Sequence, residues 1–107
     1  MKAKVKKAAL YTRVSSNGQN PKMQESELVE YVRRRGWVVH RVYTDKGISG
    51  AKQRRPALDS LLNDCRRGRV DVLVVFKFDR FARSLKQLIS GFELCKELGI
   101  DFVSITE

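Results

Sequence analysis

An arginine and a serine lie two residues apart where an apolar segment gives way to polar residues, in the stretch LYTRVSSNGQ (residues 10–19). If the apolar segment is a β-strand, Arg13 and Ser15 leave it on the same face, whereas Ser16 leaves it on the other. Side-chain direction therefore favours Ser15 over Ser16 as the hydroxyl that Arg13 can serve. Both serines could also simply end the strand through local hydrogen bonds, as serines before Asn-Gly commonly do.

A second basic group follows another apolar segment, in the stretch FKFDRFARS (residues 76–84). Arg80 and Arg83 are three residues apart at an expected helix start, so they should point the same way. Asp79 could cap that helix or hold an arginine in position. Taken alone, this stretch could be a capped and solvated turn. Arg55 adds a third basic position in a polar segment.

A hydroxyl beside several guanidinium groups is better suited to a phosphodiester than to an acyl group. Acyl transfer needs a base and an oxyanion hole. Phosphoryl transfer spreads charge over oxygens that planar arginine donors match well. Nearby positive charge also lowers the pKa of a hydroxyl. Three or four arginines could then replace a metal ion, and an arginine or a water could relay the proton in place of a histidine base.

Composition limits the remaining possibilities. The chain has 107 residues, enough for one core, and a formal net charge of +10, which favours nucleic acid as the partner. An anionic membrane surface would also suit that charge, but no segment could span a bilayer, and we expect a soluble, intracellular protein. His40 is the single histidine, which excludes a multi-histidine metal cluster. Cys65 and Cys95 are expected to be reduced thiols in or near the core.

The apolar pattern predicts strands that alternate with helices. Strands are expected over residues 8–14, 37–44, 70–78 and 100–105, and helices over residues 21–36, 56–68 and 84–99, with a polar loop over residues 45–55. The helical residues expected to face the core include Met23, Leu28, Val29 and Val32, and later Leu85, Leu88, Ile89, Phe92 and Cys95. This alternation predicts an α/β fold, a three-layer α/β/α sandwich with a mainly parallel sheet of about four strands.

Ligands of such sheets bind outside the carboxyl ends of the strands. Ser15, the polar loop and the DRFAR stretch each follow a predicted strand, so we expect all three to face one crevice. Tyr11 is expected to pack beneath it, with a hydroxyl that could reach the site. The last predicted strand ends just before Glu107, and we therefore expect the chain to be one domain of a longer protein.

Three motifs resemble those of the serine recombinases, the resolvase and invertase family. YTRVSS resembles the family's nucleophile motif, DKGISG with RRPALD its mobile loop, and FKFDRFARS its second arginine motif; together they cover almost the whole chain. The resemblance implies a resolvase-like catalytic domain in which Ser15 is the nucleophile. It also implies the other site residues: Arg13, Arg80 and Arg83 on the scissile phosphate, Asp79 orienting the arginines, Arg55 assisting from the loop, and Gln19, Gln24 and Asp45 in support.

The resemblance also implies a reaction on double-stranded DNA. Ser15 would attack a phosphodiester at a specific site, form a 5'-phosphoserine link and release a 3'-hydroxyl. The step would be reversed after strand exchange within a synaptic tetramer, with no need for ATP or a metal. Family members continue with a long dimerising helix that carries a further arginine, and with a DNA-binding domain, both of which would lie beyond Glu107. Phe78 and Phe81 stand where the family pattern suggests leucine-like residues.

A different function remains open from the residues alone. A non-catalytic, flavodoxin-like module could bind phosphate or nucleic acid through the same basic crevice. The serine and the arginines are each unremarkable in isolation, and what favours a catalytic site is their coincidence at strand ends expected to share one crevice.

Overall fold

The computed structural model of the chain describes residues 5–15, 21–47, 56–82 and 84–106. Its elements, in chain order, are β1 (Lys7–Ser15), α1 (Pro21–Arg34), β2 (Val38–Gly47), α2 (Pro56–Arg66), β3 (Val72–Val75), α3 (Phe78–Phe81), α4 (Leu85–Leu98) and β4 (Asp101–Ser104). The strands form one parallel sheet in the order β2-β1-β3-β4. The predicted α/β fold with a parallel four-stranded sheet is confirmed.

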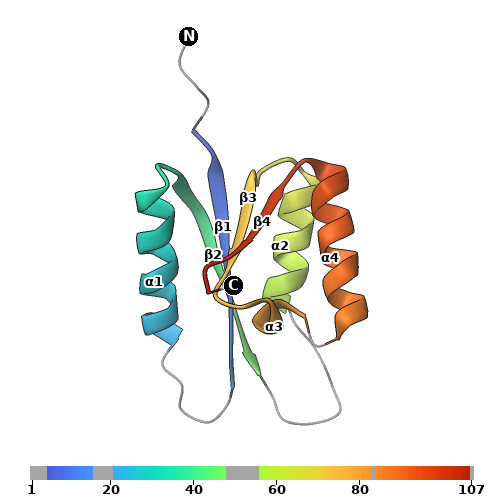
Figure 1. The fold of residues 1–107 in the computed structure, drawn as a ribbon, viewed down its shortest axis with the longest axis horizontal. Helices are drawn as coiled ribbons and strands as arrows, with labels where there is room; N and C mark the ends of the chain where they lie inside the picture. The colour runs from blue at the N-terminus through green and yellow to red at the C-terminus, as the bar shows by residue number, and fades with distance from the viewer. Residues whose placement is uncertain (1–4, 16–20, 48–55, 83, 107) are drawn as a thin grey trace.

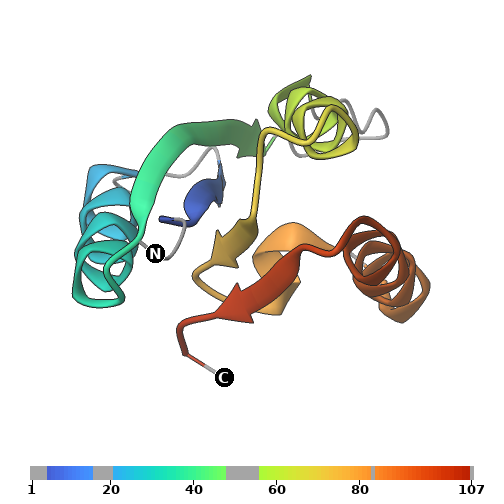
Figure 2. The same ribbon diagram turned by 90° about the horizontal axis from the view of Figure 1, so that it is seen from above.

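Helices cover both faces of the sheet and make three layers (Figures 1 and 2). Alternate residues of β1 face opposite layers. Ala8 and Leu10 pack in the cluster that contains Leu28 and Val32 of α1. Ala9 and Tyr11 pack in the cluster that contains residues of α2, α3 and α4. Because both faces are covered, residues 8–12 of β1 and all of β3 are buried, as expected for central parallel strands.

The strand order contains a reversal beside β1. The chain crosses from β1 to β2 over α1, and then returns past β1 to β3 over α2. Right-handed crossovers in opposite directions place their helices on opposite faces, and α1 and α2 do lie on opposite faces (Figure 2). The reversal between β1 and β3 is the place where such sheets bind ligands.

The inward face of α4 differs from the prediction. Leu85 is 73% exposed and Ile89 47% exposed, whereas Cys95 is buried as predicted and Gly91, which was not among the expected core residues, is buried as well. A glycine does not stand out in a pattern of apolar residues. The prediction therefore placed the buried face of α4 on neighbouring larger residues and missed Gly91. In α1, Met23 is also exposed, at 66%, because the helix packs through Leu28 and Val32.

Two strand boundaries also differ. The segment after residue 44 was expected to be a loop, yet β2 continues to Gly47 because it stays paired with β1, with Arg13 opposite Asp45 and Ser15 opposite Gly47. The strand expected over residues 70–78 is shorter, and its last residue, Phe78, begins α3. No helix within the described residues is long and apolar enough to cross a membrane.

A buried polar pair ties the edge strand β2 to α2. The Tyr43 hydroxyl donates a hydrogen bond to Asp64 Oδ2 (2.5 Å), and both residues are buried. Burial and this bond raise the pKa of Tyr43 well above its usual range. The bond lowers the pKa of Asp64, helped by Arg69, whose Nη1 lies 3.5 Å from Oδ1. The Asp64 carboxylate is thus stabilised by folding.

Acid should weaken this pair. The pKa of Asp64 is lower in the folded than in the unfolded state, so its contribution is complete above the unfolded pKa of about 3.9 and is lost as pH falls through the folded value. We expect Asp64→Asn to lower the free energy of unfolding by about 1–3 kcal/mol at pH 7, and the difference from the unmodified chain to shrink below pH about 4. Urea unfolding across this pH range measures it. Asp59→Asn, at an exposed acid of the same helix, is the control, and a constant difference at every pH would contradict the assignment.

Candidate active site

The ends of β1 and β2 and the start of α3 lie at one end of the sheet (Figure 1). Ser15 is the last residue of β1, and Arg13 precedes it by two positions in the same strand. β3 pairs with β1 up to Tyr11 opposite Val75, and the chain then enters α3 three residues later. The backbone that carries Asp79 and Arg80 therefore follows the strand beside β1.

The predicted site residues are described to different extents. Arg13 is half-buried in β1. The backbones of Ser15, Asp79 and Arg80 are placed, but their side chains are outside what the structure describes. The others, Gln19, Arg55 and Arg83, lie outside the described residues altogether.

Arg80 lies in a short helix of its own. α3 ends at Phe81, and Ala82 has an extended backbone (φ −123°, ψ 145°). Arg83 lies outside the described residues, so the expectation that Arg80 and Arg83 point the same way stays a prediction.

Asp79 also does not cap the helix that follows. α4 begins with Ser84, whose hydroxyl accepts a hydrogen bond from the Gln87 amide (3.1 Å). Ser-x-x-Gln is a known start signal for helices, so the sequence contained the information that places this boundary. The N-cap residue of α3 is Lys77, again not Asp79.

Asp45 is buried, 4% exposed, and joins three elements. It accepts hydrogen bonds from the Tyr11 hydroxyl of β1 (2.9 Å) and from the amides of Ala57 (2.9 Å) and Leu58 (3.0 Å) in the first turn of α2. A carboxylate at a helix N-terminus satisfies amides that lack a helical partner and interacts well with the helix dipole. Asp45 and Tyr11 thereby hold the start of α2, directly after Arg55, against β1.

Residues 8–107 match the family model described as Resolvase, N terminal domain. The chain belongs to the resolvase N-terminal domain family. It is 37% identical over 97 residues to the Transposon Tn917 resolvase of Enterococcus faecalis, and 40% identical over 97 residues to the Serine recombinase gin of Escherichia phage Mu. These matches cover 91% of this chain but 48% and 46% of the two relatives, so the chain spans about half the length of the curated relatives it matches.

A solved structure has the same fold. The N-terminal catalytic domain of TP901-1 integrase superposes with a TM-score of 0.82 at 38% identity, covering 94% of this chain and 78% of that one. The likeness therefore extends over nearly the whole resolvase-family domain.

Gln24 is the predicted supporting residue with an unmet hydrogen-bonding group among those that the structure describes. Its side-chain Oε1 is buried and, among the residues that the structure describes, is the side-chain atom without a hydrogen-bond partner. It lies near the start of α1, the helix that follows β1. Buried acceptors without a donor are costly.

The two cysteines of this resolvase-family domain are buried and unpaired, as predicted. Burial raises the pKa of the Cys65 thiol to about 12 and that of the Cys95 thiol to about 11. Since the thiolate is the reactive form of cysteine, neither is a nucleophile near neutral pH.

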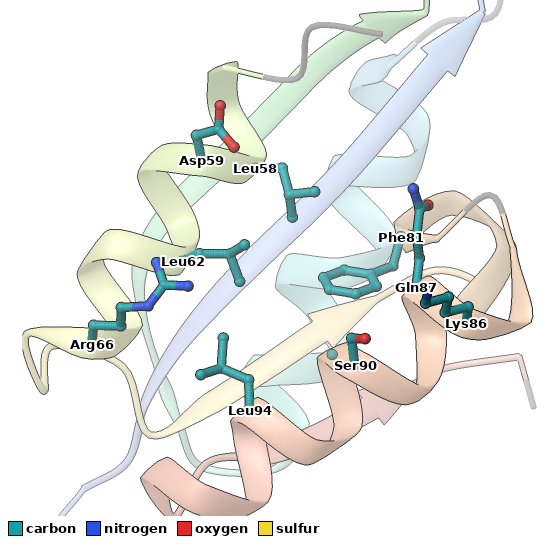
Figure 3. Close-up of a pocket in the computed structure, with 10 residues that line it drawn as sticks. Leu58, Asp59, Leu62, Arg66, Phe81, Lys86, Gln87, Ser90 and Leu94 are labelled. Carbon is teal, nitrogen blue, oxygen red and sulfur yellow. The ribbon is translucent and has the colours of Figure 1, made fainter.

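A pocket of about 620 Å³ lies between α2 and α4 (Figure 3). Leu58, Leu62, Leu94 and Phe81 give it apolar walls, and Lys86 and Arg66 are among its polar residues. None of the predicted site residues whose side chains the structure describes lines this pocket. The pocket is adjacent to α3, because Phe81 is one of its lining residues.

Proposed function

We propose that this chain is the catalytic domain of a serine site-specific recombinase, with Ser15 as the nucleophile toward a DNA phosphodiester. The observation that supports the proposal is that β1, which bears Arg13 and Ser15, pairs with β3, and that β3 leads into α3, which bears Asp79 and Arg80, in a fold of the resolvase family. The two motifs are far apart in the sequence, but one lies in β1 and the other follows β3, the adjacent parallel strand.

The proposed reaction is a transesterification. The Ser15 Oγ attacks phosphorus, and the bond between phosphorus and the 3'-oxygen breaks as the new phosphoserine bond forms. The serine proton is relayed to the released 3'-oxygen, either through a water or through an arginine that gives one of its own protons to the 3'-oxygen and takes up the serine proton in exchange, so that the 3'-oxygen becomes a hydroxyl. One phosphoester replaces another, so a 3'-hydroxyl can reverse the step after strands have exchanged, without a nucleotide to supply energy.

The arginines would act on the phosphate. Arg13, Arg80 and Arg83 would bind its oxygens and stabilise the charge that develops there. Asp79 would orient an arginine, and Arg55 would contribute from the segment before α2. Arg13 is half-buried, which favours a fixed direction for its guanidinium group.

The supporting residues would act at different distances from the reaction. Asp45 and Tyr11 would work indirectly, because their polar atoms bind each other and the start of α2. The unpartnered oxygen of Gln24 makes it a candidate for direct contact with a donor, and Gln19 would be a further supporting residue.

The proposed partners are double-stranded DNA and further copies of the protein. A net charge of +10 suits the DNA backbone, and the relatives are about twice as long as this chain. We propose that the full recombinase adds a dimerising helix and a DNA-binding domain, assembles as a dimer and a synaptic tetramer, and acts in the cytoplasm of a bacterial or archaeal host.

Trapping the covalent intermediate tests this function. The complete recombinase would be incubated with a tiled set of short duplexes from the DNA on either side of its gene, each with a mismatched or nicked centre that prevents religation. After digestion with nuclease and trypsin, the peptide of residues 14–22 should carry a nucleotide, and fragmentation should place it on Ser15. A nucleotide on another residue would overturn the assignment of Ser15. DNA binding without any adduct would favour the non-catalytic binding module.

A further inference from the structure

α3 has little to hold it in place except its side chains. It is a four-residue helix, too short to be stable alone. Its N-cap residue Lys77 makes no side-chain capping bond, and its closing backbone bond runs from the Ala82 amide to the Phe78 carbonyl (3.0 Å). The position of the backbone that carries Asp79 and Arg80 therefore depends on how the flanking residues of α3 pack.

Those flanking residues are two phenylalanines, in an aromatic cluster that joins three elements. The Phe78 ring packs edge-to-face against Phe92 of α4 and Phe102 of β4, with centroids 5.2 and 5.3 Å apart. The Phe81 ring packs edge-to-face against Phe102 at 4.8 Å and against Tyr11 of β1 at 6.2 Å. One phenylalanine at each end thus anchors α3 to α4, β4 and β1.

Gly91 of α4 makes room for one of these rings. It is buried in the middle of α4 and does not have the positive φ that favours glycine. Glycine in a helix interior is destabilising relative to alanine. A Cβ at this position would lie 2.5 Å from Cε2 and 3.0 Å from Cζ of Phe81. The Phe81 ring therefore fills the space that a side chain at position 91 would occupy, and packing explains the glycine.

We propose that Gly91 is a positioning residue for Asp79 and Arg80. By accepting the Phe81 ring against the α4 backbone, it sets how closely α3 lies against α4 and β1. The consequence for catalysis rests on the function proposed above, whereas the contact itself does not.

The pocket beside α3 makes a shift possible without unfolding. Figure 3 shows the Phe81 ring at the wall of the pocket between α2 and α4. A methyl group at position 91 would push the ring, and the pocket of about 620 Å³ offers space for it. α3 would move with the ring, because Phe81 is its last residue.

Gly91→Ala tests the proposal with two readouts. In the 107-residue chain, the amide signals of Asp79, Arg80 and Ala82 should shift in NMR spectra while the rest of the sheet keeps its pattern. In the complete recombinase, the rate of covalent adduct formation should fall on the order of ten- to a hundredfold, as small misplacements of catalytic groups cause. DNA affinity should change by less than about twofold, since the exposed charges are the same.

A shorter side chain at position 81 should rescue the variant. In Gly91→Ala with Phe81→Leu, the amide signals should return toward those of Phe81→Leu alone, and the rate should match that single variant. Ser90→Ala, at an exposed position of the same helix, is the matched control and should change neither readout. Unshifted amides in Gly91→Ala, or shifts and a rate loss that Phe81→Leu does not reduce, would overturn the proposal. If the unsubstituted recombinase forms no adduct, the proposed function fails, and the amide shifts still decide the contact.

Discussion

Ser15→Ala is expected to abolish the covalent protein–DNA link, with cleavage falling by a factor on the order of a thousand or more, as loss of a nucleophile does in other covalent enzymes. Without the Ser15 Oγ atom, the proposed phosphoserine bond cannot form. The affinity for duplex DNA should change by less than about twofold, because the side chain carries no charge. Gel separation of the adduct and binding titrations at one fixed salt concentration measure the two effects.

Ser16→Ala is the matched control, since it removes the same hydroxyl one position along the chain. It should cleave at close to the unsubstituted rate, because the proposal assigns the attack to the Ser15 Oγ, and the sequence pattern predicts that the two serines point to opposite faces. Cleavage that persists in Ser15→Ala and disappears in Ser16→Ala would show that Ser16, and not Ser15, is the nucleophile. Cleavage that persists in both variants would show that neither serine is the nucleophile.

Arg13→Lys is expected to slow adduct formation by about a hundredfold although the positive charge is kept. A guanidinium group donates two parallel hydrogen bonds to phosphate oxygens, and an ammonium group acts as a point charge. Loss of one preorganised donor typically costs about 3 kcal/mol in the transition state. Single-turnover cleavage, measured with the enzyme in excess, reports this step.

Arg13→Gln separates charge from geometry. It should slow cleavage at least as much as Arg13→Lys, and it should also reduce the salt dependence of DNA binding by about one phosphate contact, whereas Arg13→Lys should leave it unchanged. Full-rate cleavage by Arg13→Lys would mean that Arg13 contributes only charge. Equal unfolding free energies of the two variants are the check that neither result is a folding defect.

The fold was largely predictable because its signals are local. The apolar run of β3 requires cover on both faces, and Pro21 and Pro56 are each the first residue of the helix expected from them. The handedness of β-α-β crossovers then leaves few ways to arrange such elements. The parallel sheet and its three layers follow from these rules together.

The features that the sequence did not reveal depend on partners far along the chain. β2 extends to Gly47 because β1 continues beside it. The true inward face of α4 includes Gly91, whose importance appears only when the Phe81 ring lies against it. Asp45 of β2 accepts hydrogen bonds from amides in the first turn of α2. The spacing of residues along the sequence does not predict this contact, because Asp45 belongs to a different element.

The sequence by itself determined the chemistry that is available: a serine and an arginine on one strand, further arginines after another, and a strong positive charge. Only the tertiary structure decided which strand ends are neighbours, that α3 is a separate short helix, and that Tyr11 and Asp45 bind each other rather than an open site. The physical reason is that residue type and spacing set local conformation and reactivity, whereas the meeting of distant segments depends on packing and hydrogen bonds that form only when the whole sheet is assembled.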